Sequence, residues 1–201
     1  MKLSRLRSPG MARSAALTVL LLLGTSLSWA TLVPRLTVEQ MVDESASVVE
    51  GTVLRKWAAW DGAHQFIWTH YEIEVTDILK GVVGSTVTVS EPGGEVGGMH
   101  MSIASVPTYE VGEQVVILLS PTEIGFFRTC GWGQGKFSVE TASGQKTVSA
   151  PGFGAQIVDM PSKNGEKSIG TARKSLDGLS LSDFKSRLRE LIQSRADKGG
   201  R

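Results

Sequence analysis

The hydrophobic pattern changes its period near residue 47, from the spacing of a helix to the alternation of a β-strand. Two β-rich stretches, Val48 to Trp60 and Phe66 to Leu79, are separated by an Asp61-Gly62 turn signal. Asp-Gly between two alternating stretches is typical of a β-hairpin. The pattern therefore predicts a long antiparallel hairpin.

The alternation continues in shorter stretches after this hairpin. We expect further strands over Ser85 to Glu91, Met99 to Ala104, Gln114 to Leu119, Phe126 to Thr129, Lys136 to Glu140 and Lys146 to Ser149. No long helical stretch separates them, and strands that follow one another in this way favour an antiparallel sheet. The pattern alone predicts an antiparallel barrel or sandwich.

Helical patterns stand at both ends of the β-rich region. Thr37 and Gln40 have the spacing of a capping box, which predicts a short helix from about Val38 to Glu44. Ser180 opens a second helical pattern, for which we expect an amphipathic helix over residues 181–195. Its apolar face carries Phe184, Leu188, Leu191 and Ile192.

The N-terminus has the layout of a secretory signal. Four basic residues precede an apolar stretch from Ala15 to Leu23, and Ser28-Trp29-Ala30 carries small residues at the positions that a signal peptidase reads. We expect residues 1–30 to be cleaved, which predicts a secreted or periplasmic protein without a membrane span. An uncleaved N-terminal anchor is the alternative.

The remaining residues suit a single folded domain. We assign residues 31–150 to the β-domain and its N-terminal helix, and residues 151–180, rich in Gly, Ser and Lys, to a loop-rich linker. Residues 196–201 after the C-terminal helix are expected to form a disordered tail.

Charge and cysteine content narrow the possible partners. The chain has 21 basic and 20 acidic residues, and loss of the four basic residues of the signal leaves 17 against 20, a net charge of −3. This balance argues against nucleic acid as a partner. Cys130 is the single cysteine, so we expect a buried thiol, with a disulfide between two chains as the alternative.

The segment from Glu91 to Ser102 is rich in glycine. Because a strand pattern follows Gly93, Gly94, Gly97 and Gly98, and not the helix that a phosphate-binding loop requires, we predict a tight connection between strands. Met99-His100-Met101 offers ligands that suit copper, but strand geometry would turn the histidine away from both methionines. We expect neither a metal site nor a cofactor.

The sequence contains neither a Gly-x-Ser-x-Gly nor a His-Glu-x-x-His motif, and it predicts no enzyme. The hairpin offers a different kind of candidate site. Its expected outer face carries Trp57, Phe66, Trp68 and His70. We expect the C-terminal helix to cover these residues. The alternatives are a β-bulge that turns them inward and a partner that binds them.

Several phrases occur in a familiar order: SASVVEGTV, YEIEVTDILKG, EPGGEVGG, VGEQVVILL and GQGKFSV. Together they resemble a family of exported bacterial hypothetical proteins. More distantly, the chain resembles the netrin-like module of tissue inhibitors of metalloproteinases, which implies an OB-like antiparallel β-barrel. Those inhibitors chelate zinc through an N-terminal cysteine, whereas this mature chain would begin at Thr31.

The resulting hypothesis is an exported, non-enzymatic β-barrel module that binds a protein or peptide partner. Its candidate binding residues are Trp57, Phe66, Trp68 and His70. An inhibitor or accessory protein of an exported metalloprotease is one alternative, and a periplasmic copper carrier is another.

Overall fold

The computed structural model describes residues 32–150, 156–158 and 172–199. The predicted signal peptide lies outside the described residues, as do most of the predicted linker and the last two residues of the predicted tail. No helix within the described ranges is long and apolar enough to cross a membrane.

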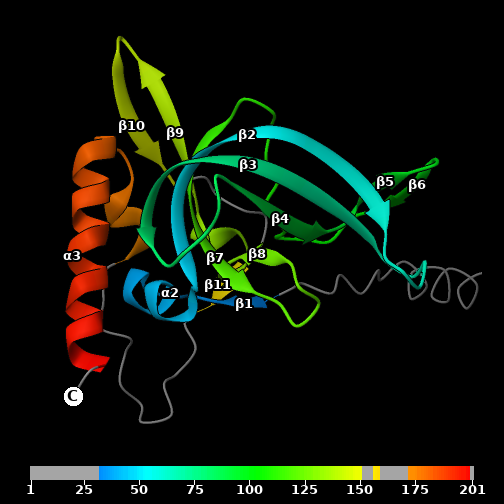
Figure 1. Ribbon diagram of the computed structural model, residues 1–201, viewed down its shortest axis with the longest axis horizontal. Coiled ribbons are helices and arrows are strands. Elements are labelled where there is room, and N and C mark those ends of the chain that lie inside the picture. Colours follow the sequence, from blue (N-terminus) through cyan, green and yellow to red (C-terminus); the bar gives the residue numbers. More distant parts are fainter. Residues whose placement is uncertain (1–31, 151–155, 159–171, 200–201) are drawn as a thin grey trace, which may run out of the picture. The chain divides into compact units, whose positions relative to one another are not determined.

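The predicted fold class is confirmed: the protein is mainly β, with a short helix near the N-terminus and a helix at the C-terminus (Figure 1). The elements are β1 (Leu32–Pro34), α2 (Val38–Glu44), β2 (Ser47–Trp60), β3 (Ile67–Lys80), β4 (Thr86–Pro92), β5 (Gly94–Val96), β6 (Met99–Met101), β7 (Gln114–Pro121), β8 (Phe127–Thr129), η1 (Trp132–Gly135), β9 (Lys136–Ala142), β10 (Gln145–Ser149), β11 (Gln156–Val158), η2 (Arg173–Leu176) and α3 (Leu181–Gly199).

The main sheet has the strand order β10-β9-β7-β2-β3-β4-β8, and β8 also pairs with β7. The pairings of β2, β3, β4, β8 and β7 therefore form a ring, which β4 and β8 close through a single residue pair and which we call the barrel. One expectation is corrected here, because the sheet is mixed. β4 and β8 run parallel and pair at Val89 and Phe127, because the other four pairings around this ring of five strands are antiparallel.

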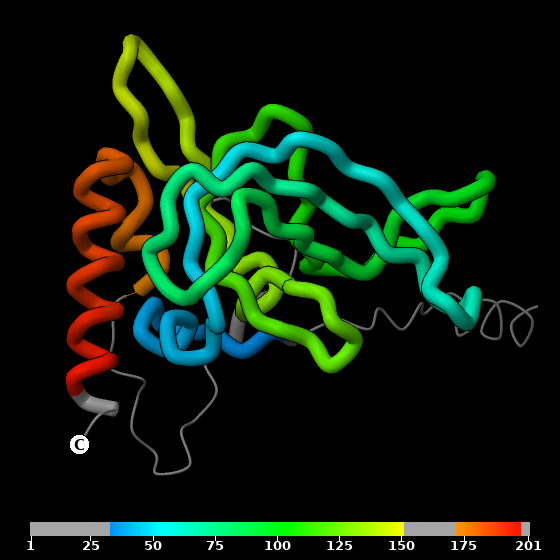
Figure 2. The backbone as a smooth tube through the Cα atoms, viewed as in Figure 1, coloured from blue at the N-terminus to red at the C-terminus, as the bar shows by residue number. Residues whose placement is uncertain are grey.

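The two longest strands, β2 and β3, curve together (Figure 2). Their register shifts between Val48 and Val49, between Glu50 and Gly51, and between Val53 and Arg55. Such irregularities bend a strand and increase its twist. At Gly51 the strands approach so closely that an added Cβ would lie 2.4 Å from the Glu74 carbonyl oxygen, so only glycine fits.

Two hydrophobic cores lie on opposite faces of the same strands. One fills the barrel and includes Val49, Tyr71, Ile73 and Tyr109. The other lies between the sheet and the helices and includes Met41 of α2, Phe137 of β9, and Phe184 and Leu188 of α3. Because the two sets alternate along β2 and β7, these strands are buried on both faces.

The short helix α2 begins and ends at the residues that the sequence predicts. Its capping box is present: Gln40 Oε1 accepts the Thr37 backbone N–H at 2.8 Å, and Thr37 Oγ1 accepts the Gln40 backbone N–H at 3.2 Å. These bonds satisfy two donors that the first turn of a helix otherwise leaves unpaired.

The helix α3 is fixed to the sheet by ion pairs. Lys185 Nζ lies 2.5 Å from a Glu50 carboxylate oxygen and 2.6 Å from one of Asp77, and Arg189 binds the same Asp77 oxygen at 2.6 Å. The helix continues to Gly199, so the expectation of a disordered tail is corrected for residues 196–199. A hydrogen bond from Gln193 to Asp197, one turn apart, supports the extension.

Further differences concern small elements. β6 ends at Met101, three residues before the predicted end, and pairs with the unpredicted β5. The predicted linker contains β11, which pairs in parallel with β1, and the short helix η2. These segments carry no strong hydrophobic period of their own, which is why the sequence pattern did not reveal them.

Candidate functional site

The outer face of the β2–β3 hairpin carries a cross-strand aromatic pair. Trp57 and His70 lie opposite each other in the register, and their rings stack with centroids 5.2 Å apart and an interplanar angle of 29°. Arg55 places its guanidinium carbon 4.6 Å from the centroid of the Trp57 ring, and it also forms an ion pair with Glu72 at 2.8 Å. The Trp57 ring is therefore contacted both by a cation and by an imidazole ring.

Phe126 extends this pair into a cluster. Its ring contacts His70 edge-on at 5.4 Å and Trp68 at 6.3 Å, measured between centroids. Phe126 belongs to the loop between β7 and β8, and this loop is closed because Thr122 Oγ1 accepts the Phe126 backbone N–H at 3.1 Å. We call Trp57, Trp68, His70 and Phe126 the aromatic surface.

His70 occupies the centre of the aromatic surface and has a polar partner. Its Nδ1 lies 2.7 Å from the hydroxyl of Ser90, the residue opposite it on β4. Partial burial lowers the pKa of His70 below its usual value, because a charged imidazolium is disfavoured away from water.

The expectation that the C-terminal helix covers these residues is wrong. Phe184 of α3 packs on Phe137 of β9, with ring centroids 4.9 Å apart, and Leu188 belongs to the same helix-side core. The apolar face of α3 is thus already occupied. Trp57 keeps 37% of its surface exposed, and the register shifts of β2 lie closer to its start, so no bulge turns Trp57 inward.

The four predicted residues are not all brought together. Trp57, Trp68 and His70 share the aromatic surface, whereas Phe66 lies in the hairpin turn and is 49% exposed. Phe126 was missed, because no sequence period connects the loop before β8 with the hairpin. The signal lies in the strand pairings, since β8 pairs with β4 and β4 with β3, which brings the loop before β8 to the hairpin.

The glycine-rich segment forms a small hairpin of its own, in which β5 and β6 meet through Gly97 and Gly98. All four glycines have positive φ, from 59° at Gly97 to 133° at Gly94. A Cβ at Gly94 would lie 2.4 Å from Thr69 Oγ1, whereas a Cβ at Gly97 would meet nothing within 4 Å. At position 94 only glycine leaves room for the neighbouring side chain. At position 97 glycine is favoured only because the turn requires a positive φ.

The histidine of this hairpin has no cluster of ligands around it. His100 pairs with Glu95, and strand alternation directs it away from Met99 and Met101. Among the described residues, no group of three or more His, Cys, Asp or Glu side chains has an arrangement that could hold a metal ion.

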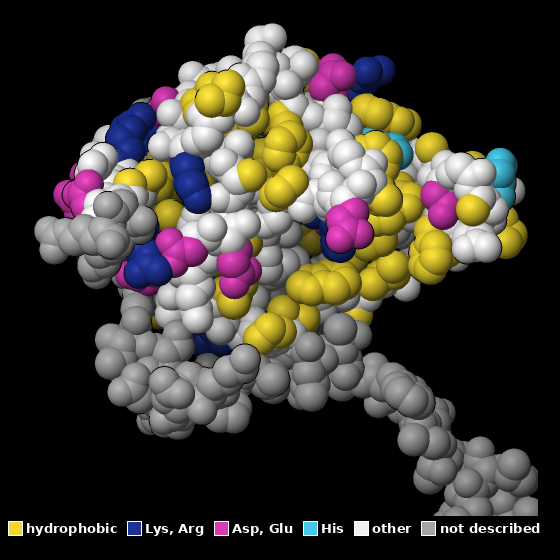
Figure 3. All heavy atoms as spheres, turned by 60° about the horizontal axis from the view of Figure 1, so that its bottom comes forward, with side chains coloured by type: hydrophobic (Ala, Val, Ile, Leu, Met, Phe, Trp, Pro, Cys, Tyr) yellow, Lys and Arg dark blue, Asp and Glu magenta, His cyan; other side chains and the backbone are white. Residues whose placement is uncertain are grey.

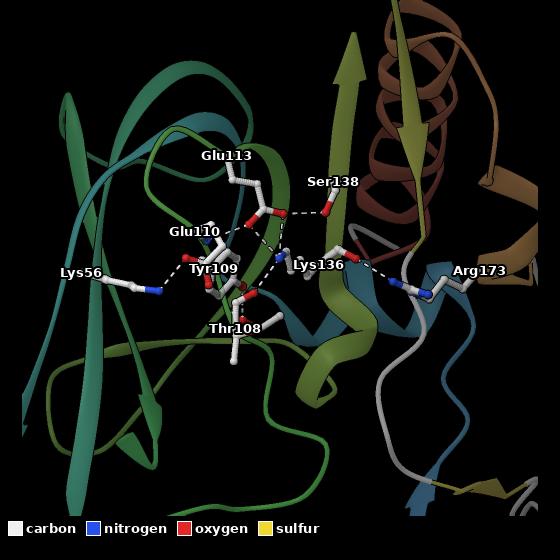
Figure 4. A network of polar contacts seen from close by, with 9 residues as sticks. Lys56, Thr108, Tyr109, Glu110, Glu113, Lys136, Ser138 and Arg173 are labelled. Atoms are coloured by element: carbon white, nitrogen blue, oxygen red, sulfur yellow. Dashed lines mark hydrogen bonds and ion pairs between the residues drawn. The ribbon is translucent and has the colours of Figure 1, made fainter. Parts of the chain in front are cut away.

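A dense polar network lies between the barrel and β9 (Figure 4). Lys136 Nζ donates to the Thr108 carbonyl at 2.6 Å and pairs with the Glu113 carboxylate at 2.7 Å. Glu113 also accepts from the Ser138 hydroxyl at 2.7 Å and from the Glu110 backbone N–H at 3.0 Å. These hydrogen bonds hold the pKa of Glu113 below its usual value against the opposing effect of burial. Since each group already has a partner in the chain, the network serves the fold.

A fully buried carboxylate closes the barrel wall. Glu91 is 1% exposed, accepts the Thr129 backbone N–H at 2.7 Å and binds the Arg128 guanidinium at 3.2 Å. Burial raises the pKa of Glu91, although Arg128 and Thr129 oppose the rise. Cys130 is 1% exposed, and burial raises the pKa of its thiol as well. Neither group is presented to a ligand on the surface.

No protein-family model matches the chain, and no curated protein sequence matches it either. The site is therefore argued from geometry alone. The polar residues in the phrases that carry the resemblance, among them Glu50, Glu91, Glu113 and Lys136, make the internal contacts described above. These residues hold the fold, and the aromatic surface is a separate feature of the chain.

Proposed function

We propose that this protein is an exported, non-enzymatic module that binds a protein or peptide partner through the aromatic surface. The observation that carries the proposal is the arrangement of Trp57, His70, Phe126 and Trp68, which is fixed by internal contacts and lies outside both cores. Figure 3 shows hydrophobic side chains gathered in a band that extends toward the side where the β2–β3 hairpin ends. A contiguous exposed apolar patch is typical of an interaction site.

The location of the aromatic surface supports this proposal. In OB-type barrels, ligands bind on the face of the second and third strands, bordered by the loops that follow the first and fourth strands. Here Trp68 and His70 belong to the second strand of the ring, and Phe126 belongs to the loop after the fourth. The partner would therefore meet the same face that such barrels commonly use.

The composition of the aromatic surface favours a polypeptide partner. Tryptophan and arginine are the residues that most often dominate binding energy in protein interfaces. The Arg55 side chain is 64% exposed and Trp57 is 37% exposed. The contact between them limits the conformational entropy lost on binding. Export is supported by the signal-like N-terminus.

Capture from the native envelope fraction tests the proposal. A mature domain with a photo-cross-linking phenylalanine analogue at Phe126 should yield a defined cross-linked partner. The double variant Trp57→Ala with Trp68→Ala should lose that product. The control Ile78→Ala, which alters an equally exposed apolar residue of β3 outside the aromatic surface, should keep it. Equal cross-linking by both variants would refute the proposed surface.

The identity of a captured partner decides between the two protein-binding hypotheses. If it is an exported metalloprotease, its activity with and without the domain distinguishes an inhibitor from an accessory protein. Zinc chelation by Cys130 is not part of this proposal, because the thiol is buried and hydrogen-bonds toward the Met41 carbonyl at 3.6 Å.

A further inference from the structure

The ring of strands is only partly paired between β4 and β8. β4 pairs with β3 along its whole length, but it pairs with β8 only through Val89 and Phe127. Beyond this pair, toward the C-terminal end of β4, the Glu91 carboxylate bridges to the Thr129 N–H. Before it, residues 86–88 have no second strand neighbour within the described part of the chain. A short edge of β4 is therefore open.

The backbone N–H and C=O groups at this edge point away from β3. Hydrogen bonds near the two ends of the β3–β4 ladder join Val75 N–H to Ser85 O at 2.8 Å and Gly93 N–H to Ile67 O at 2.7 Å. Bonded and non-bonded pairs alternate along an antiparallel ladder. Thr86 and Thr88, which lie between Ser85 and Gly93 in this alternation, therefore direct their backbone groups to the opposite side. There the parallel pair of Val89 with Phe127 uses the Thr88 carbonyl, so the groups left open are the N–H and C=O of Thr86 and the N–H of Thr88.

A groove of about 270 Å³ runs along the same edge. Its lining includes Thr86, Val87 and Thr88 of β4 together with Phe126 and Phe127. Val82 lies at the groove and is 93% exposed. The groove thus combines an unpaired strand edge with apolar walls, and it shares Phe126 with the aromatic surface.

We infer that this groove takes an extended peptide segment of the partner, which adds to the edge of β4 as a further strand. Main-chain hydrogen bonds to an open edge supply affinity in this mode of binding, and alternate side chains supply specificity. The inference rests on the proposed function, because it states the form in which the partner binds.

The register defines the peptide that fits. Thr88 and Ser90 lie opposite Glu72 and His70, so they share the face of the aromatic surface, whereas Val87 faces the barrel interior. Alternate residues of an added strand would therefore point toward the aromatic surface, beside Phe126, and the others toward the apolar interior. We expect a segment with apolar residues at alternate positions and no proline where it pairs with β4.

A short fluorescent peptide of alternating valine and threonine, flanked by lysine, is the probe. We expect saturable binding in fluorescence anisotropy and slower hydrogen exchange of the Thr86 and Thr88 amides. Methylation of the backbone nitrogens on alternate peptide residues should weaken binding about tenfold or more, because it removes donors and leaves side chains unchanged. Val82→Lys should weaken binding, and the matched exposed control Val111→Lys should not.

Three results would overturn the inference: no binding at millimolar peptide, equal binding of the methylated peptide, or protection of both amides in a dimer without peptide. The double variant Trp57→Ala with Trp68→Ala separates this outcome from the proposed function. If the double variant loses the native partner while the parent protein does not bind the probe peptide, only the inferred strand addition is refuted. If it keeps the native partner, the aromatic surface fails instead.

Discussion

Trp57 and His70 face each other across β2 and β3 with their rings stacked, and His70 is held at the same time by Ser90 and by the edge of Phe126. The imidazole is thus packed on two sides by aromatic rings and bound through one nitrogen. A titratable ring in this position makes the aromatic surface sensitive to pH.

Acidification should destabilise the protein through His70. Its pKa is lowered in the folded state by burial, while the unfolded chain titrates near 6.5, so the unfolded state binds the proton first. The contribution of His70 to the free energy of unfolding is therefore fully present above the pKa of the unfolded chain. It is lost as the pH falls through the lower pKa of the folded state. His70→Gln should remove this part of the pH dependence, as seen by urea unfolding at several pH values. An identical pH profile in parent and variant would contradict the assignment, and NMR titration of the ring gives the direct check.

Loss of the Glu91 carboxylate should open the barrel wall. Glu91→Ala leaves the Thr129 N–H and the Arg128 guanidinium without their buried acceptor, which we expect to cost about 3 kcal/mol of unfolding free energy. Glu95→Ala on β5 is the matched control and should change stability by less than about 0.5 kcal/mol. Chemical denaturation of both variants is the measurement, and equal stabilities would show that Glu91 does not close the wall.

Two glycines of the β5–β6 hairpin should respond differently to alanine. At Gly94 the new methyl group would overlap Thr69 and lie 3.2 Å from the Ala58 Cβ, so we expect a loss of more than about 2 kcal/mol. At Gly97 the space is open, and only the positive φ opposes alanine, at about 1 kcal/mol. Gly97→Asn, which tolerates that φ, should be nearly neutral. Thermal or urea unfolding would refute this explanation if Gly97→Ala proved the more harmful change.

Phe184 should matter for stability and not for the aromatic surface. Phe184→Ala removes a fully buried ring from the helix-side core and should cost about 3–5 kcal/mol. Glu190→Ala, on the exposed side of α3, should cost little. Under conditions where Phe184→Ala remains folded, acrylamide quenching of tryptophan fluorescence should match that of the parent. Increased quenching in the folded variant would indicate that α3 does cover the tryptophans.

Local features of the sequence predicted most of the fold. The capping box of Thr37 and Gln40 located α2, and the Asp61-Gly62 turn located the long hairpin, because both signals depend on neighbouring residues only. The parallel contact between Val89 and Phe127 was not predictable in this way. It depends on how strands distant in sequence meet, which no local period encodes.

The candidate site, too, was predictable from the sequence only in part. Alternation along β2 and β3 placed Trp57, Trp68 and His70 on one face. It could not show what covers that face, since the apolar positions of α3 fit either the aromatics or another core equally well. The strand order of the sheet places Phe137 of β9 against Phe184, so α3 packs on this core and not on the aromatic surface.

The double burial of β7 has a consequence for how the protein melts. Val115, Ile117 and Leu119 fill the barrel, while Val116 and Leu118, the residues between them, belong to the helix-side core. A strand that serves both interiors cannot leave one of them intact while the other comes apart. The barrel and its helical layer should therefore behave as one cooperative unit, with a single heat-absorption peak in calorimetry and no stable barrel that has shed its helices.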